Sequence, residues 1–109
     1  KAQVNYQNTI SDEIPIGLKY DILTICKEMI TNFMKYSNGN QLQLFLLEQN
    51  NYYTIQYKDN GNKTHNITPG MGLTMMKELV EKHKGVMTLQ TTNGYDIFIR
   101  IPKQEEHHD

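Results

Sequence analysis

Apolar residues recur along this chain with two different spacings, which predict helices in some segments and strands in others. From residue 19 to residue 37 they recur every three or four positions, as on one side of an α-helix with its turn of about 100° per residue. That apolar side contains Ile22, Leu23, Ile25, Cys26, Met29, Ile30, Phe33 and Met34. The pair Asn38-Gly39 follows, and it predicts that the helix ends in a left-handed residue.

A second helix is predicted over residues 73–84, because its apolar residues and His83 share one side and Gly85 follows. Alternating or continuous apolar runs predict strands at residues 3–10, 41–48, 52–58, 86–91 and 95–101. Asn93-Gly94 predicts a tight hairpin between the last two strands. This order predicts the α+β class, as a two-layer α/β sandwich whose mixed, mostly antiparallel sheet has both helices on one face.

Composition and charge narrow the possible functions. The 109 residues include 11 basic and 12 acidic side chains, so no basic excess is available to replace the counterions of a nucleic acid. A single cysteine excludes an internal disulfide framework, and no apolar run reaches the roughly 18 residues that a membrane span needs. Because the chain begins at Lys1, we expect residues 1–109 to be one domain cut from a longer protein, with a flexible tail at 103–109.

Glu28, Asn32 and Lys35 fall on one polar stripe of the first predicted helix, since their spacings of four and three bring them within about 60° of one another. A carboxylate, an amide oxygen and an ammonium group suit hydrated Mg²⁺ and phosphate, because Mg²⁺ prefers oxygen ligands and lysine attracts phosphate. The alternative is a solvated helix face with a stabilising ion pair.

Two glycine-containing segments flank the loop before the second helix. Asp59-Asn60-Gly61 places a carboxylate at a strand end, where it can accept a hydrogen bond from an exocyclic amine such as that of adenine. Gly61 leaves room for a planar base. Gly70-Met71-Gly72-Leu73 opens the helix, where free N–H groups and the helix dipole can bind phosphate. The alternatives are an ordinary Asn-Gly turn and a flexible connecting loop.

In this order and spacing, the three features resemble the ATP-binding domain of sensor histidine kinases, whose superfamily includes DNA gyrase, MutL and the heat-shock chaperone ATPases. The resemblance covers roughly residues 18–102. Residues 28–37 (EMITNFMKYS) resemble the N box, residues 59–61 (DNG) the G1 box and residues 70–73 (GMGL) the G2 box. It implies the Bergerat ATP-binding fold, with residues 60–70 as the ATP lid.

The same resemblance implies ATP and Mg²⁺ as cofactors. The nucleotide-binding residues that it implies are Asn32, Lys35, Asp59, Gly61, Gly70, Gly72 and Leu73. Asn32 would ligate Mg²⁺, and the catalytic residue Glu28 would hold a metal-bound water or polarise the reaction. Lys35 would reach the phosphates, and Asp59 would bind the adenine amino group beside Gly61. Gly70, Gly72 and Leu73 would surround the phosphates.

The implied function is the catalytic domain of a bacterial sensor histidine kinase. It would donate the γ-phosphate of ATP to a histidine on a separate dimerisation domain, with a response regulator downstream, and would have little activity alone. We expect it to contact neither nucleic acid nor membrane and to lie in the cytoplasmic part of a membrane-bound sensor.

Two alternatives share the fold: an anti-sigma-factor-type serine kinase and a non-catalytic interaction module. The module stays open because the second glycine that often follows in the G1 box is absent after Gly61. In addition, Tyr95 follows Gly94 where the family often has threonine.

Overall fold

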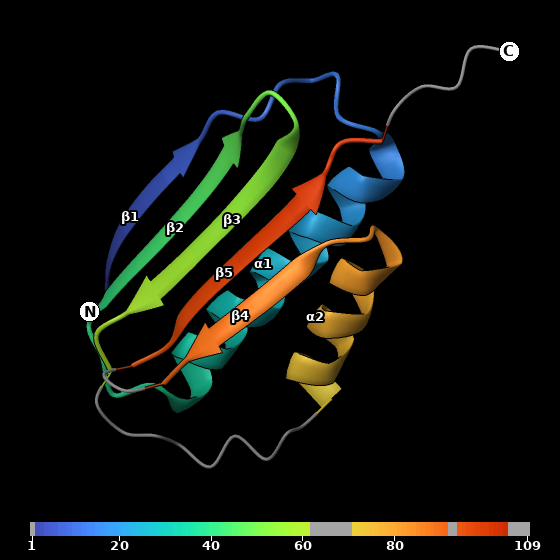
Figure 1. Cartoon of the computed structure of the whole chain (residues 1–109). Coiled ribbons are helices and arrows are strands. Elements are labelled where there is room, and N and C mark those ends of the chain that lie inside the picture. Colours follow the sequence, from blue (N-terminus) through green and yellow to red (C-terminus); the bar gives the residue numbers. More distant parts are fainter. Residues whose placement is uncertain (1, 62–70, 92–93, 105–109) are drawn as a thin grey trace, which may run out of the picture.

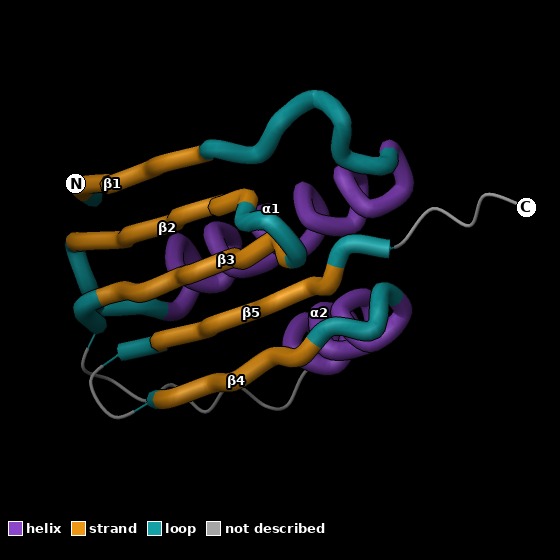
Figure 2. Tube along the Cα trace, turned by 45° about the horizontal axis from the view of Figure 1, so that its top comes forward, coloured by secondary structure: helices purple, strands orange, loops and turns teal. Residues whose placement is uncertain are grey.

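Two helices pack on one face of a five-stranded sheet in the computed structural model, which describes residues 2–61, 71–91 and 94–104 (Figure 1). The elements are β1 Gln3–Asn8, α1 Ile16–Tyr36, β2 Gln41–Glu48, β3 Tyr52–Asp59, α2 Met71–Lys82, β4 Val86–Gln90 and β5 Asp96–Pro102. The tube view shows the same two layers, with one face of the sheet left without a helix (Figure 2). The predicted two-layer α+β sandwich is confirmed.

The strand order is β1-β2-β3-β5-β4, and only the β1–β2 pair is parallel within the described residues. A parallel pair needs a crossover connection, and α1 provides it. The hairpin of β4 and β5 is turned so that β5 lies between β3 and β4. As a result, the ends of α1 and β3 and the beginnings of α2 and β5 all lie at one end of the molecule (Figure 1).

The core lies between the sheet and the helices. Ile25 and Met29 of α1 are 1% and 2% exposed, and Ile55 of β3 and Met76 of α2 are fully buried. Every second residue of β5 from 97 to 101 is buried, so this face of the strand points into the core. The single cysteine, Cys26, is also buried, and burial raises its pKa to about 11. It therefore acts as a core residue and not as a reactive thiol.

Both helices begin and end earlier than the sequence predicts. α1 begins at Ile16 and follows Pro15, while α2 ends at Lys82. The predicted left-handed end at Asn38-Gly39 is wrong, because α1 leaves through Ser37 in an extended conformation (φ −81°, ψ 141°). Positive φ occurs among the described residues only at Lys84 (60°) and Gly94 (91°).

The predicted apolar side of α1 is wider than the surface that the sheet covers. Leu23 and Met34, which were both assigned to that side, are 50% and 77% exposed. They lie at its margin, about 160–180° around the helix from Ile25. The sheet therefore buries a narrower strip than the sequence pattern suggests.

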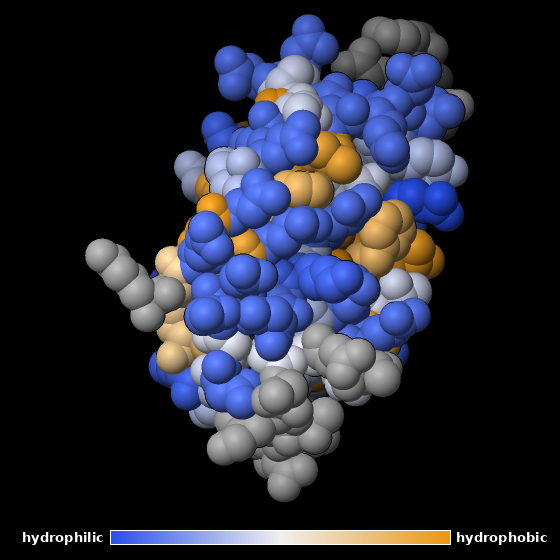
Figure 3. All heavy atoms as spheres, turned by 90° about the vertical axis from the view of Figure 1, so that its left-hand side faces the viewer, coloured by the Kyte–Doolittle hydropathy of each residue, from blue (hydrophilic) through white to orange (hydrophobic). Residues whose placement is uncertain are grey.

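β1 forms an edge of the sheet, and all six of its residues are exposed. Viewed from this side, the molecule is mostly hydrophilic, with apolar residues in separate spots (Figure 3). Polar residues on an edge strand reduce unwanted pairing with other chains. In the part of the chain that the structure describes, neither helix is both long and apolar enough to cross a membrane.

A polar contact fixes α1 against the end of α2. Oδ2 of Asp21 lies 2.6 Å from Nε2 of His83 and 3.0 Å from Nζ of Lys82. The Asp21 side chain is only 17% exposed, although the sequence pattern places it on the solvent side of α1. The hydrogen bond from His83, and to a smaller extent Lys82, holds the pKa of Asp21 below its ordinary value of 3.8.

We expect Asp21→Asn to lower the free energy of unfolding at pH 7 by about 1 kcal/mol, because it removes the charge from this contact. The folded-state pKa of Asp21 lies below the unfolded value, so the stabilisation is present above pH ~4 and is lost as pH falls through the folded pKa. Chemical denaturation at pH 7 and pH 3 measures this. Glu81→Gln, which removes an equal charge from the exposed side of α2, is the control and should have little effect. If the free energy of unfolding differs between wild type and Asp21→Asn by the same amount at pH 3 as at pH 7, the Asp21 charge does not stabilise the fold.

Candidate functional site

The carboxylate of Asp59 is the centre of the polar end of the sheet. Asp59 is the last residue of β3 and is 4% exposed, because strand alternation turns it to the helix side, as it does Tyr57. Its Oδ1 accepts hydrogen bonds from the backbone N–H groups of Gly61 (3.0 Å) and Tyr95 (3.2 Å). Its Oδ2 accepts one from the Tyr57 hydroxyl at 2.7 Å. Among the described residues these donors fill three of the roughly four acceptor positions of a carboxylate, and the fourth position is on Oδ2.

Two glycines allow the chain to pack around this carboxylate. A Cβ on Gly94, at φ +91°, would lie 2.5 Å from the carbonyl oxygen of Asp59 and 2.6 Å from Oδ1. A Cβ on Gly61 would lie 2.5 Å from Oγ of Ser37, at the end of α1. Gly61 was predicted to leave room for a base, and in this structure the Ser37 hydroxyl takes the space beside it.

The predicted polar stripe of α1 faces the beginning of α2. Asn32 is half-buried and lines a cavity between the helices and the sheet, whereas Lys35 is exposed. Glu28 is partly exposed, and its carboxylate lies so close to Gly72 that a Cβ there would overlap Oε1. A carboxylate near the first turn of a helix is favourably placed in the helix dipole. The structure thus brings Glu28 and Gly72 together, although they are far apart in the sequence.

The cavity next to Asp59 is small in this structure. It is lined by Met29, Asn32, Phe33, Ser37, Tyr57, Leu73, Met76, Tyr95 and Ile97. Its open space is about 20 Å³, which is on the order of one water molecule. Ligand pockets usually enclose roughly 300 Å³ or more, so the open space in this structure is too small for a base. Of the predicted phosphate-side residues, Leu73 lines this cavity, and Gly70 lies outside the described residues.

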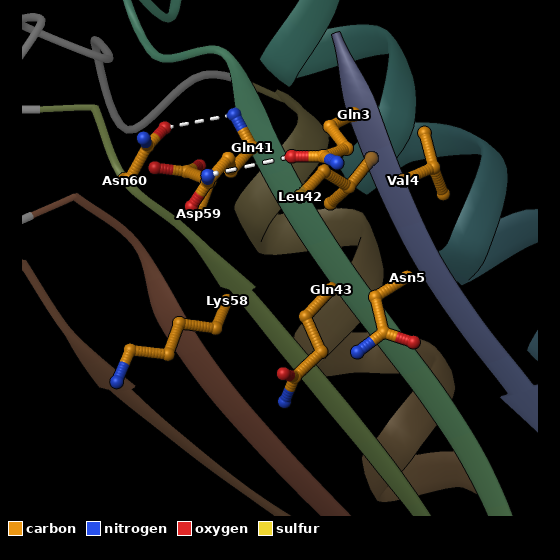
Figure 4. A pocket seen from close by; sticks show the side chains of 9 residues that line it. All are labelled: Gln3, Val4, Asn5, Gln41, Leu42, Gln43, Lys58, Asp59 and Asn60. Atoms are coloured by element: carbon orange, nitrogen blue, oxygen red, sulfur yellow. Dashed lines mark hydrogen bonds between the residues drawn. The ribbon is translucent and has the colours of Figure 1, made fainter.

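A larger groove of about 590 Å³ lies at the β1 side of the sheet (Figure 4). Its polar lining on β1 and β2 comes from Gln3, Asn5, Gln41 and Gln43, with Lys58 of β3 beside them. These side chains share the sheet face that has no helix, as the strand register requires. Asp59 also lines this groove, but its carboxylate accepts hydrogen bonds from Tyr57 and Tyr95, which both line the small cavity. We therefore assign the candidate site to the small cavity.

Sequence reasoning missed three residues that build this site. Tyr57 and Ser37 contact Asp59 and Gly61, and Asn60 joins the strand end to the loop after α1. Oδ1 of Asn60 accepts hydrogen bonds from the N–H groups of Asn40 and Gln41, each at 2.9 Å. Tyr57 could have been found, because residues two apart on a strand share a face. Nothing local in the sequence indicates the other two contacts.

Charge and burial act on both tyrosines of the site. Burial and the hydrogen bond to Asp59 raise the pKa of Tyr57 far above its ordinary value. Burial and the charge of Asp59 also raise the pKa of Tyr95. Both hydroxyls are therefore neutral at pH 7, and Tyr57 can act as a hydrogen-bond donor to the carboxylate.

Among the described residues, no group of three or more His, Cys, Asp or Glu side chains is arranged to hold a metal ion. The predicted magnesium ligand, Asn32, would not need such a cluster, because its amide oxygen would be one of only a few protein ligands. Mg²⁺ commonly takes one or two protein oxygens and completes its shell with waters and phosphate oxygens.

Comparison with known proteins identifies the class of this domain. The fold matches the histidine kinase domain of the Erythrobacter litoralis EL346 blue-light activated histidine kinase with a TM-score of 0.80 and 19% identity, over 93% of this chain and 51% of that one. It also matches the Acinetobacter baumannii histidine kinase AdeS with a TM-score of 0.67 and 18% identity, over 93% of this chain and 55% of that one. No family model matches the chain.

The sequence is similar to a particular kinase as well. The sensor protein kinase WalK of Staphylococcus aureus is 35% identical over 100 aligned positions, which cover 68% of this chain and 24% of that protein. In strain JH9 the coverage of WalK is 16%, so the chain spans a quarter or less of these relatives. By fold and by sequence, the chain is a catalytic domain of the sensor histidine kinase type.

We expect Gly94→Ala to destabilise the fold by about 2 kcal/mol, because it adds a Cβ at positive φ against the Asp59 carboxylate. Gly17→Ala is the matched control, since a Cβ there meets nothing within 4 Å and alanine favours the helix. Thermal unfolding of the two variants measures the difference. Equal unfolding temperatures would show that the Gly94 position tolerates a side chain.

Proposed function

We propose that this domain binds ATP with Mg²⁺ and presents the γ-phosphate to a histidine on a separate dimerisation domain. The observation that carries the proposal is the Asp59 carboxylate. Among the described residues three donors hold it in place, and two of them, Tyr57 and Tyr95, line the small cavity. A buried acceptor of this kind can select an adenine base through its exocyclic amine.

The remaining predicted residues have places consistent with this proposal. Asn32 lines the cavity beside Asp59, so an Mg²⁺ ligand there would lie on the α1 side of the nucleotide. Gly72 and Leu73 stand at the beginning of α2, where helix N–H groups attract phosphate. Glu28 would hold a metal-bound water, and exposed Lys35 would neutralise phosphate charge. Phosphoryl transfer depends mainly on such positioning and charge neutralisation.

The chemistry of these residues fits an adenine nucleotide, whereas the volume of the cavity in this structure does not. The proposal therefore requires an open conformation. Bound Mg²⁺ would supply charge neutralisation at the β- and γ-phosphates, and the residues of this chain would bind and orient.

We further propose that the domain is part of a longer, membrane-bound sensor kinase and lies in its cytoplasmic portion. Its partners would be the histidine-containing dimerisation domain and a downstream response regulator. The sequence similarity to a sensor protein kinase favours a sensor kinase over an anti-sigma-factor-type serine kinase. One observation favours the non-catalytic module as a second candidate, namely the small open space beside Asp59.

Asp59→Asn should weaken ATP binding by about 10–100-fold, which corresponds to the loss of a charge-assisted hydrogen bond. Wild type should also prefer ATP to GTP, because guanine has a carbonyl oxygen where adenine has its amine, and the variant should lose this preference. Calorimetric titration with both nucleotides measures each effect. Asp96→Asn, an exposed acid in β5, is the control. An ATP preference that survives in Asp59→Asn would refute the adenine contact, and absence of heat with millimolar ATP would favour the non-catalytic module.

Asn32→Ala should weaken binding of ATP with Mg²⁺ by about tenfold more than binding of ATP in excess EDTA, since only the former uses the amide oxygen. Lys27→Ala, on the exposed side of α1, is the control and should change neither. Equal losses with and without the metal would assign Asn32 a packing role.

A further inference from the structure

Tyr95 is held at the candidate site by its backbone, and it lines the small cavity. Its N–H group donates to Oδ1 of Asp59 at 3.2 Å, and its carbonyl oxygen accepts from the N–H of Asp59 at 3.0 Å. These two bonds tie the beginning of β5 to the end of β3. The backbone of Tyr95 therefore cannot shift without breaking the Asp59 cluster, whereas its side chain can change rotamer.

Tyr95 borders the space through which a ligand of Asp59 would approach from the helix side. It lines the small cavity together with Tyr57 and Leu73 and packs against the hydrophobic core. The effect of the Asp59 charge on the Tyr95 hydroxyl also indicates that the ring is near the carboxylate. Only about 20 Å³ remains open beside the ring. Three of the other lining side chains have less room to move, since Met29, Tyr57 and Met76 are each 2% exposed or less.

We propose that Tyr95 sets the nucleotide affinity of this domain by occupying the space of the adenine base, so that a nucleotide binds only when the ring has turned out of the cavity. This inference rests on the proposed function, because it takes the ligand of Asp59 to be an adenine nucleotide. Tyr95 is half-buried and lies at the rim of the core, so its ring can reach solvent by a rotamer change.

The size of the effect follows from the population of the open conformation. When only a fraction of the molecules can bind, the apparent dissociation constant is the intrinsic one divided by that fraction. Minor conformations of folded proteins are commonly populated at ~0.1–10%, so removing the ring should tighten binding by about tenfold or more.

The test is a calorimetric titration of the chain with ADP and Mg²⁺, for wild type, Tyr95→Thr and Tyr95→Phe. Tyr95→Thr should bind ADP about tenfold more tightly or better, because threonine keeps the backbone bonds and leaves the space open. Tyr95→Phe is the matched control, since it removes only the hydroxyl, and it should bind as wild type does. In stopped-flow measurements with a fluorescent ADP, the gain of Tyr95→Thr should appear in the association rate.

Thermal unfolding of each variant separates this role from packing. A packing residue alone would give Tyr95→Thr a lower unfolding temperature with unchanged or weaker ADP binding, and that result would overturn the inference. If Tyr95→Thr does not fold, Tyr95→Val replaces it, since valine also suits a strand and also removes the ring.

The two proposals fail in different ways. If wild type binds ADP, Asp59→Asn does not, and Tyr95→Thr is no tighter than wild type, Tyr95 does not control access while the adenine site stands. If neither wild type nor the Tyr95 variants bind ADP, both the site and the inference are overturned. If Tyr95→Thr binds where wild type does not, both are supported.

Discussion

The need to satisfy one buried carboxylate organises the functional end of this domain. Asp59 is almost fully buried, and a buried charge is costly unless hydrogen bonds replace the water that it has lost. Its three donors come from a neighbouring position on the same strand, from the turn that follows, and from the beginning of β5. Meeting this requirement fixes how β3 ends and β5 begins. It also requires glycine at position 94, where any Cβ would displace the carboxylate.

The position of the helices follows from constraints at both ends of α2. At its beginning, Gly72 lies directly against Glu28 of α1, so the two helices approach closely there. At its far end, Asp21 of α1 contacts Lys82 and His83. Close approach at one end and a charged contact at the other hold α2 over the sheet. The small cavity lies at the Gly72 end, where Met29, Asn32 and Phe33 of α1 line it.

The same cavity explains why residue type alone does not establish affinity. The polar groups around it suit an adenine nucleotide, but the side chains that fill it decide whether one can enter. Tyr57 strengthens the cluster by donating to Asp59, whereas Tyr95 occupies volume. A site can therefore retain its recognition chemistry and still bind weakly.

The sequence by itself determined the elements, their order, the fold class and the positions of the polar motifs. It could do so because hydrophobic spacing and glycine placement are local properties: Ile25 and Met29 reveal a buried helix side, and Asp59 follows a strand wherever that strand pairs. Only the tertiary structure decided that Leu23 and Met34 remain exposed, that α1 leaves through an extended Ser37, and that Asp21 is half-buried between the helices. It also decided that Tyr57 and Tyr95 share the surroundings of Asp59. These outcomes depend on which surfaces meet when residues distant in the chain pack together, and no local pattern contains that information.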